Sequence, residues 1–530
     1  MSDVSDERSE RHGGEATGIQ CGRRMKVLIV TPEITYVPRE MAGSSPNLSA
    51  KAGGLGDVSA SLVSALFRMG ADVHVALPHY RRMFHTGIAD VMEEKRRRYY
   101  EELDDTCRIH LAEDRTFYYR ESVYDRNNEE SLKMSLTFQR EVINHIIMEV
   151  RPDLIHCNDW MTGLIPAFAR SMGIPSLFTV HNIHTQWATL EQIENAGIDT
   201  ALFWENLYYE RQPVNYEETR SGNRVDLLTS GIFGAHFINT VSPTFLKEIV
   251  DNRHAFVPPQ IQTQIANKYH AGCAAGILNS PDPHYNSSTD DFLLRKFGPA
   301  DVVEGKRQNK LALQEALGLT CNPNAPILFW PSRLDPVQKG PQLLTDILYA
   351  IIHDYWDDQL QLAIVADGPF QQYFVDIMRQ HHLEDRIGVH CFNERLSHIG
   401  YAASDFVLMP SRFEPCGLPQ MIGPLYGSLP IVHDTGGLHD TVEHLNLEAD
   451  TGNGFVFKYY DAPGLRWAID EAMRFYHAPQ ARREAVIARV MREASSRFTH
   501  QVTANEYIRI YERMLQRPLI AGEGASAAES

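Results

Sequence analysis

The stretch S-R-F-E-P-C-G-L-P-Q at residues 411–420 contains the carboxylate with the most specific surroundings in the chain. Glu414 lies between an apolar run that predicts a buried strand and a Pro/Gly turn that should begin a helix. A carboxylate at the mouth of a cleft can bind sugar hydroxyls or face a developing cationic centre. On its own, Glu414 can equally be an acid that caps the following helix. The motif therefore indicates a site without proving one.

Two cations lie in one loop of the second half of the chain, P-S-R-L-D-P-V-Q-K-G at 331–340. Arg333 can clamp phosphate oxygens with its forked guanidinium, and Lys339 supplies a mobile point charge. Together they can neutralise a leaving diphosphate. Taken singly, each is more commonly a solvated surface residue.

The run K-A-G-G-L-G-D at 51–57 predicts a phosphate seat in the first half. Its adjacent glycines, Gly53 and Gly54, allow close approach of the backbone, and the helix that follows presents free N–H groups. The run lacks the G-K-[ST] ending of a Walker loop. An ordinary tight turn with a solvated Lys51 is the alternative. The turn D-T-G-G-L-H-D-T at 434–441 also offers glycine amides near a helix start.

His181 and Asp159 each end a predicted strand of the first half. Without further context, the first reads as a structural histidine and the second as a helix cap. The chain has no H-E-x-x-H motif and no tight His/Asp cluster, so we predict no metal site. It has no G-x-S-x-G elbow, which argues against an α/β-hydrolase.

These residues must be positioned by the elements around them. Along the chain, short apolar runs end in polar or glycine-rich turns and are separated by helical stretches. This pattern is typical of a doubly wound α/β domain. It occurs twice, so we predict two Rossmann-like domains that face each other across a cleft. The predicted strands are 26–33, 71–78, 153–159, 176–182 and 237–242 in the first half, and 326–332, 360–367, 386–392, 405–410 and 429–434 in the second.

The polar clusters all follow predicted strands, and parallel sheets bind ligands beyond the carboxyl ends of their strands. We predict domains over 25–290 and 291–495, a C-terminal helix over 496–516 that returns to the first domain, and disordered tails at 1–24 and 517–530. Between the first two strands, Val58, Leu62, Leu66 and Met69 recur at helical spacing and should face the sheet.

Composition excludes several functions. The chain has 530 residues and a formal charge of −18, which argues against nucleic acid as the main partner. Its seven cysteines are scattered without C-x-x-C pairs, which favours free thiols in a reducing cytoplasm. We see no signal peptide and no apolar run long enough to span a membrane.

Taken together, the motifs resemble those of the bacterial glycogen synthases and plastid starch synthases. The resemblance covers about residues 25–515. The matching motifs are, in order, K-A-G-G-L-G-D-V, H-C-N-D-W, T-V-H-N, I-N-T-V-S-P-T, G-I-L-N, S-R-L-D-P-V-Q-K-G, S-R-F-E-P-C-G-L and D-T-G-G-L-H-D-T-V. So many motifs in register outweigh the structural alternatives given for each one. The resemblance implies a GT-B type fold and a retaining glucosyltransferase without a cofactor.

The resemblance also implies roles for the candidate residues. Glu414 corresponds to the critical acid and Asp159 to a carboxylate near the acceptor. The implied contacts with the donor diphosphate come from Lys51, Gly53, Gly54, Arg333 and Lys339. The implied contacts with the transferred glucose come from His181 and Asn279, and the E-P-C-G-L motif adds Cys416, Gly417 and Leu418 to the donor site.

The implied reaction transfers glucose from a nucleotide sugar to the non-reducing end of an α-1,4-glucan with retention of configuration. Two cations and nearby amides can neutralise the departing nucleoside diphosphate without Mg²⁺. Same-face attack and double displacement both remain open. ADP-glucose is favoured over UDP-glucose because the K-x-G-G-L motif resembles the bacterial and plastid branch.

Two departures from the family pattern stand out. The segment 34–50 is long, and Pro419 replaces a common threonine, which removes one N–H. The alternatives are a related transferase that makes sucrose, trehalose or a cell-surface glycan, and a non-catalytic glucan-binding protein. A phosphorylase would require pyridoxal phosphate.

Overall fold

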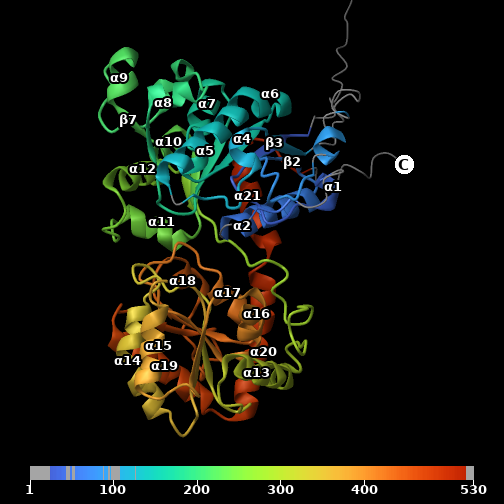
Figure 1. Ribbon diagram of the computed structural model, residues 1–530, viewed down its shortest axis with the longest axis vertical. Helices are drawn as coiled ribbons and strands as arrows, with labels where there is room; N and C mark the ends of the chain where they lie inside the picture. Colours follow the sequence, from blue (N-terminus) through green and yellow to red (C-terminus); the bar gives the residue numbers. More distant parts are fainter. Residues whose placement is uncertain are drawn as a thin grey trace, which may run out of the picture.

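Two parallel sheets, each flanked by helices, lie one above the other along the long axis of the molecule (Figure 1). The computed structural model of the protein describes residues 24–42, 48–50, 54–87, 89–93, 96, 108–125 and 127–520. The predicted α/β fold with two Rossmann-like domains is confirmed. We call the first sheet with its helices the first domain, and the second sheet with its helices the second domain.

The first sheet has seven parallel strands in the order β3-β2-β1-β4-β5-β8-β9. Its strands are β1 Lys26–Val30, β2 Asp72–Pro78, β3 Ile109–Ala112, β4 Leu154–Asn158, β5 Ser176–Val180, β8 Phe237–Thr240 and β9 Ala274–Gly276. A small antiparallel pair, β6 Trp187–Thr189 and β7 Arg224–Asp226, stands apart from it.

The second sheet has six parallel strands in the order β12-β11-β10-β13-β14-β15. Its strands are β10 Ile327–Trp330, β11 Gln361–Val365, β12 Ile387–His390, β13 Phe406–Met409, β14 Leu429–His433 and β15 Phe455–Phe457. In each sheet the strand order reverses beside the first strand, between β1 and β4 and between β10 and β13. This is the point at which doubly wound sheets bind ligands.

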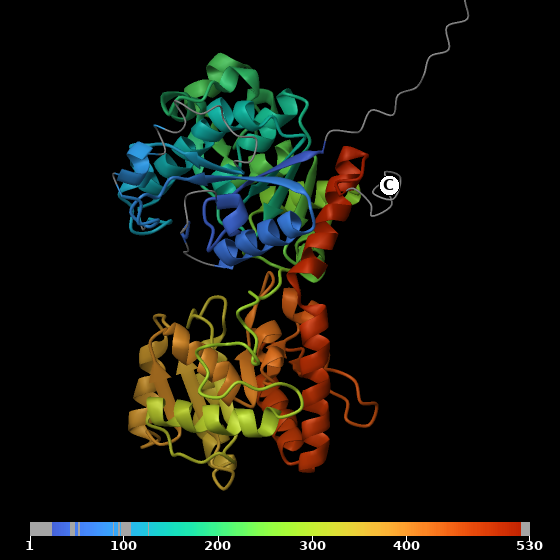
Figure 2. The same ribbon diagram turned by 90° about the vertical axis from the view of Figure 1, so that its right-hand side faces the viewer.

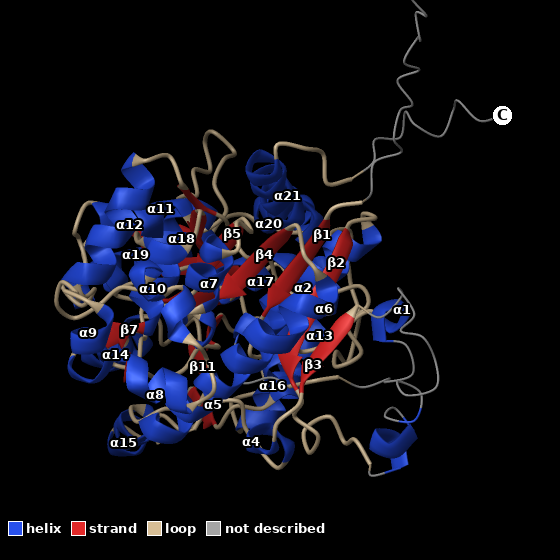
Figure 3. Ribbon diagram, turned by 90° about the horizontal axis from the view of Figure 1, so that it is seen from above, coloured by secondary structure: helices blue, strands red, loops and turns tan. Residues whose placement is uncertain are grey.

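Helices pack against both sheets, and Figure 3 shows them on either side of the strands of the first sheet. In the first domain they are α1 Arg39–Ala42, α2 Gly54–Arg68, α4 Arg115–Tyr118, α5 Asn128–Glu141, α6 Ile147–Val150, α7 Ile165–Ser171, α8 Leu190–Asn195, α9 Tyr216–Gly222, α10 Leu227–Gly234, α11 Pro243–Val250 and α12 Pro259–His270. In the second domain they are α13 Val302–Leu317, α14 Pro341–Asp354, α15 Gln371–Gln380, α16 Glu394–Ala403, α17 Pro419–Leu425, α18 Gly436–Thr441 and α19 Ala462–Tyr476.

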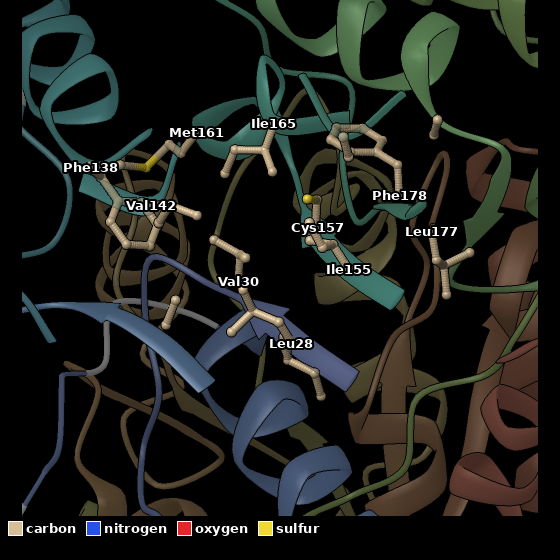
Figure 4. Packing of buried hydrophobic residues seen from close by; sticks show 14 of the residues in the cluster. Leu28, Val30, Phe138, Val142, Ile155, Cys157, Met161, Ile165, Leu177 and Phe178 are labelled. Carbon is tan, nitrogen blue, oxygen red and sulfur yellow. The ribbon is translucent and has the colours of Figure 1, made fainter. Parts of the chain in front are cut away.

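Burial on both faces explains why the central strands are almost continuously apolar. Figure 4 shows Leu28 and Val30 of β1 beside Ile155 and Cys157 of β4, with Phe138 of α5 packed nearby. In α2, the predicted sheet-facing residues Val58, Leu62 and Leu66 are buried, and Met69 lies just beyond the end of the helix.

The last two helices connect the domains. Helix α20, Gln480–Arg497, packs on α17 of the second domain, and α21, His500–Leu515, packs on α2 of the first (Figure 2). Tyr507 and Tyr511 of α21 are fully buried in the core of the first domain. Within the described ranges, no helix combines the length and apolar character that crossing a membrane requires.

Candidate active site at the junction of the domains

Glu414 lies in the loop that connects β13 to α17, and its side chain is buried. The ammonium of Lys339 forms an ion pair with Oε2 of Glu414, and the hydroxyl of Ser411 donates to the same oxygen at 3.0 Å. The residue that precedes α17 is Leu418, and no side chain caps this helix. The geometry therefore places Glu414 against a cation rather than at the helix start.

A close backbone approach brings Lys339 to Glu414. Gly340 has φ +71°, and a Cβ there would lie 2.2 Å from the carbonyl oxygen of Pro410. Only glycine allows the 331–340 loop to lie against the end of β13 in this way. In the same loop, Arg333 is exposed and forms no ion pair with any residue that the structure describes.

Asp159 and His181 lie at the carboxyl ends of the neighbouring strands β4 and β5. The Asp159 carboxylate accepts hydrogen bonds from the His181 amide at 2.8 Å and from Nδ2 of Asn182 at 2.9 Å. Burial raises the pKa of Asp159 to about 7, the hydrogen bond from the His181 amide opposes this rise, and the nearby charge of Glu33 adds to it. This carboxyl group therefore titrates near neutral pH.

His181 is neutral at physiological pH because burial lowers its pKa to about 3. Its Nε2 lies 2.9 Å from Oδ1 of Asn158, whose Nδ2 donates to the carbonyl oxygen of Val30 at 3.1 Å. The Asn158 oxygen must therefore accept, so Nε2 of His181 carries the proton and Nδ1 is the acceptor.

Asn279 follows β9 and is buried where the two domains meet. Its Oδ1 is buried and has no hydrogen-bond partner among the described residues. An unsatisfied buried oxygen costs about 1–3 kcal/mol. A hydroxyl or amine of a bound ligand would remove this cost.

The turn after Glu414 combines a buried thiol with free amides. Cys416 packs between the domains against Val241 and Met421, and burial raises the pKa of its thiol to about 12. In the part of the chain that the structure describes, the amides of Gly417 and Leu418 donate no hydrogen bond. Pro419 is the first residue of α17, where an N–H has no partner inside the helix.

The phosphate seat predicted at 51–57 lies partly outside the described residues, because Lys51 and Gly53 are not described. Gly54 begins α2 and is exposed, and no atom of the described residues would lie within 4 Å of a Cβ added there.

The turn at 434–441 does not offer its glycine amides to a ligand, and this expectation was wrong. The Gly436 amide donates to the carboxylate of Glu248, and the Gly437 amide donates to the carbonyl oxygen of Glu414 at 2.9 Å. The chain's own acceptors, one of them from the other domain, already occupy both groups.

The structure thus forms two groups of candidate residues, one in each domain. Lys339 contacts Glu414 in the second domain, and Asp159 contacts the backbone of His181 in the first. No hydrogen bond or ion pair joins the two groups within the described residues. The carboxyl ends of both sheets point toward the junction, since α11 follows β8, α18 follows β14, and these two helices pack together.

Two features escaped the sequence-based prediction. Phe392 is 58% exposed in the loop after β12, and its amide donates to Oδ1 of Asp367 at 3.1 Å. The predicted strand 386–392 includes Phe392, but β12 ends at His390.

Glu248 was also missed because it lies inside a helix and reaches the other domain, a contact that no local pattern indicates.

Comparisons with known proteins agree with this architecture. Residues 26–257 match the family described as Starch synthase catalytic domain, and residues 319–488 match Glycosyl transferases group 1. A glycogen synthase of Exiguobacterium sibiricum is 32% identical over 87% of this chain and 95% of its own length. A glycogen synthase of Bacillus subtilis is 30% identical over 88% of this chain and 95% of its own length.

The fold is also similar to solved structures. The catalytic domain of starch synthase IV from Arabidopsis thaliana, bound to ADP and acarbose, superposes with a TM-score of 0.72 and 26% identity, covering 94% of this chain and all of that one. A sucrose-phosphate synthase from Thermosynechococcus elongatus gives a TM-score of 0.55 at 19% identity, covering 93% of this chain and all of the other; this likeness concerns the fold alone.

Proposed function

Since this chain belongs to the family of glycogen and starch synthases, we propose that it transfers glucose from ADP-glucose to the non-reducing end of an α-1,4-glucan with retention of configuration. The observation that carries the proposal is the pairing of Lys339 with the buried Glu414; Arg333, from the same loop as Lys339, has no ion-pair partner among the described residues. This arrangement combines cations for a leaving diphosphate with a carboxylate for the sugar. The ADP and acarbose bound to the similar starch synthase IV support the proposed donor and acceptor.

Departure of the nucleoside diphosphate is assigned to the second domain. Arg333 and Lys339 neutralise the growing negative charge, and the free amides of Gly417 and Leu418 add hydrogen bonds. These groups act most strongly on charge that develops in the transition state, so they raise kcat more than they tighten ground-state binding. We propose that this set serves in place of a divalent metal, with Lys51 and the amides of Gly53 and Gly54 approaching from the first domain.

Stabilisation of the sugar is assigned to residues of both domains. Glu414 faces the positive charge that develops at the anomeric carbon, and Asn279 and the neutral His181 bind glucose hydroxyls. Asp159, as a carboxylate, accepts a hydrogen bond at the acceptor end. The acceptor 4-hydroxyl attacks on the face that the diphosphate leaves: the bond from the anomeric carbon to the diphosphate oxygen breaks, the new glycosidic bond forms, and the hydroxyl proton passes to the departing diphosphate, which retains configuration. A covalent glucosyl intermediate is the alternative route.

One kinetic experiment tests the proposal. Glucose incorporation into glycogen is measured with ADP-glucose and with UDP-glucose, with and without EDTA, for the wild type, Lys339→Ala and Glu414→Gln. We expect a higher kcat/KM with ADP-glucose, no loss in EDTA and a kcat lowered roughly 10²–10³-fold in Glu414→Gln. We also expect Lys339→Ala to lower kcat more than it weakens glycogen binding.

Each result has a counterpart that contradicts one part of the proposal. A preference for UDP-glucose overturns the donor assignment, and loss in EDTA that Mg²⁺ restores overturns the metal-free assignment. A Glu414→Gln variant with nearly normal kcat at saturating substrates removes Glu414 from the reaction. Product analysis without glycogen identifies a transferase that makes another sugar.

A further inference from the structure

Helix α11 of the first domain contacts the second domain through a buried carboxylate. Glu248 is 6% exposed, and its oxygens accept hydrogen bonds from the hydroxyl of Thr435 at 3.1 and 3.3 Å and from the amide of Gly436 at 3.1 and 3.2 Å. Nε2 of His254 lies 2.9 Å from Oε2 of Glu248. These contacts fix the start of α18, and we call residues 435–437 the turn.

Hydrogen bonds keep Glu248 ionised. Burial alone would raise its pKa, but the hydrogen bonds from His254 and from the Gly436 amide outweigh burial and hold the pKa below its usual range. A buried carboxylate with this many donors is also held in one position, since each donor removed would leave it less satisfied.

The turn that Glu248 holds lies directly against the backbone of Glu414. The Gly437 amide donates to the carbonyl oxygen of Glu414 at 2.9 Å. At Gly436, where φ is +46°, a Cβ would lie 2.0 Å from the same oxygen. The turn therefore cannot move without moving the peptide of Glu414 or leaving this oxygen without its donor.

A second contact reaches the neighbouring residue of the same loop. The ring of Phe256, from the first domain, packs on Phe413 with 3.9 Å between ring centroids, and the ring of His254 lies 5.0 Å from that of Phe256. The first domain therefore contacts Phe413 directly and reaches Glu414 through the turn at 435–437, although neither residue belongs to it.

We propose that Glu248 is a positioning residue, which holds the turn at 435–437 and through it the carboxylate of Glu414 in the reactive arrangement. The inference rests on the proposed function, because it assigns Glu248 to the reaction of Glu414. Its consequence is that Glu414 is correctly placed only while Glu248 of α11 holds the turn at 435–437. The approach of the two domains is then coupled to assembly of the active site.

The test combines Glu248→Gln with a matched control at the same interface. The control is Thr244→Val, because the Thr244 hydroxyl also bonds across it, to Oδ1 of Asp440 at 2.7 Å, but does not touch the turn at 435–437. We expect Glu248→Gln to lower kcat by roughly 10- to 100-fold, as a small misplacement of a catalytic group does. KM for the donor and the affinity for ADP should stay within about twofold of the wild type, and Thr244→Val should leave kcat unchanged.

A double-mutant cycle shows whether Glu248 acts through Glu414. If it does, Glu248→Gln has no further effect on kcat in a Glu414→Gln background. If the fold-losses in kcat of the two single variants multiply in the double variant, the proposal is overturned. It is also overturned if Thr244→Val loses as much kcat as Glu248→Gln. Should Glu248→Gln fold poorly, Phe256→Leu is the second variant, because it weakens the packing on Phe413 in the loop that carries Glu414. It too should have no further effect on kcat in a Glu414→Gln background.

Hydrogen exchange provides a readout that does not depend on catalysis. In Glu248→Gln, amides in the segments 411–418 and 435–438 should exchange faster, while those of the distant strand β11 should not change. Unchanged exchange in both segments overturns the proposal even if activity falls. If the wild type transfers no glucose but Glu248→Gln shows this loss of protection, the proposed function is contradicted and the positioning contact is supported.

Discussion

Asp159 and His181 show how burial assigns different protonation states to neighbouring groups. The pKa of Asp159 is raised to about 7, whereas that of His181 is lowered to about 3. In both cases burial disfavours the charged form. Between pH 5 and 9, His181 therefore stays neutral, and Asp159 is the member of the pair that changes its charge.

We expect this titration to appear in the pH dependence of activity. An acid with a raised pKa is protonated below about pH 7 and is a carboxylate above it. If the ionised form binds the acceptor, kcat/KM for glucan rises with pH through about 7. Initial rates from pH 5.5 to 9, with ionic strength held constant, test this in the wild type and in Asp159→Asn. The variant should be slow, and its kcat/KM for glucan should not rise with pH through about 7. A rise that persists in Asp159→Asn belongs to another group.

The candidate residues were predictable to the extent that strand order brings them together. Lys339 and Glu414 follow β10 and β13, which pair in the sheet, and Asp159 and His181 follow β4 and β5, which also pair. Sequence alone therefore indicated that these side chains follow the carboxyl ends of parallel strands, whereas the pairing of the strands came from the structure. The occupied amides of Gly436 and Gly437 were not predictable, because their acceptors come from residues distant in the chain.

At the scale of elements, α21 docks on the first domain through a buried polar network. The hydroxyl of Tyr511 lies 2.8 Å from Nδ1 of His156, and that of Tyr507 accepts from Nδ2 of Asn239 at 3.0 Å. Thr179 joins the two halves of the network, bonding to both His156 and Asn239 at 2.6 Å. A satisfied network of this kind specifies one docking position for the helix.

We predict that Tyr511→Phe destabilises the protein. The change removes the hydroxyl and leaves a buried nitrogen of His156 without a partner, so the free energy of unfolding should fall by roughly 1–3 kcal/mol. Urea denaturation measures the change. Tyr476→Phe is the matched control, since its exposed hydrogen bond to the carbonyl oxygen of Asn324 should contribute less than about 1 kcal/mol. If both variants lose the same free energy of unfolding, the buried network contributes no more than an exposed hydrogen bond does.

In the two parallel sheets, the strands that sequence reasoning missed are short and lie at the edges. β3, β9 and β15 have four, three and three residues, and β9 is Ala-Ala-Gly, which has little tendency to form a strand. They form because a neighbouring strand offers a free edge, which is a tertiary effect. The long apolar strands in the middle of each sheet were visible because burial on both faces requires their composition.

At the scale of the whole molecule, the junction of the two domains has free space beside it. A cavity of about 510 Å³ lies between them, lined by Arg68 of α2, the linker at 281–288 and the turn from Phe498 to Gln501 that joins α20 to α21. Apolar contacts at the junction include a cluster with Val241, Cys416 and Phe498 and the packed rings of Phe256 and Phe413. Domains of one chain commonly move relative to each other at such junctions.

The final prediction concerns this movement. Lys51 precedes α2 in the first domain, whereas Arg333 and Lys339 belong to the second. If Lys51 acts only when the domains close on the donor, Lys51→Ala should lower kcat/KM for ADP-glucose while the melting temperature stays within about one degree, since a side chain used only in the closed state adds little to the stability of the open one. Lys133→Ala, at an exposed lysine of α5 in the same domain, is the control and should change neither quantity. Steady-state kinetics and thermal denaturation on the same samples show whether Lys51 acts on the donor or stabilises the fold. A fall of several degrees in Lys51→Ala would identify Lys51 as a structural residue, because a side chain that acts only in the closed state contributes nothing to the unfolding of the open one.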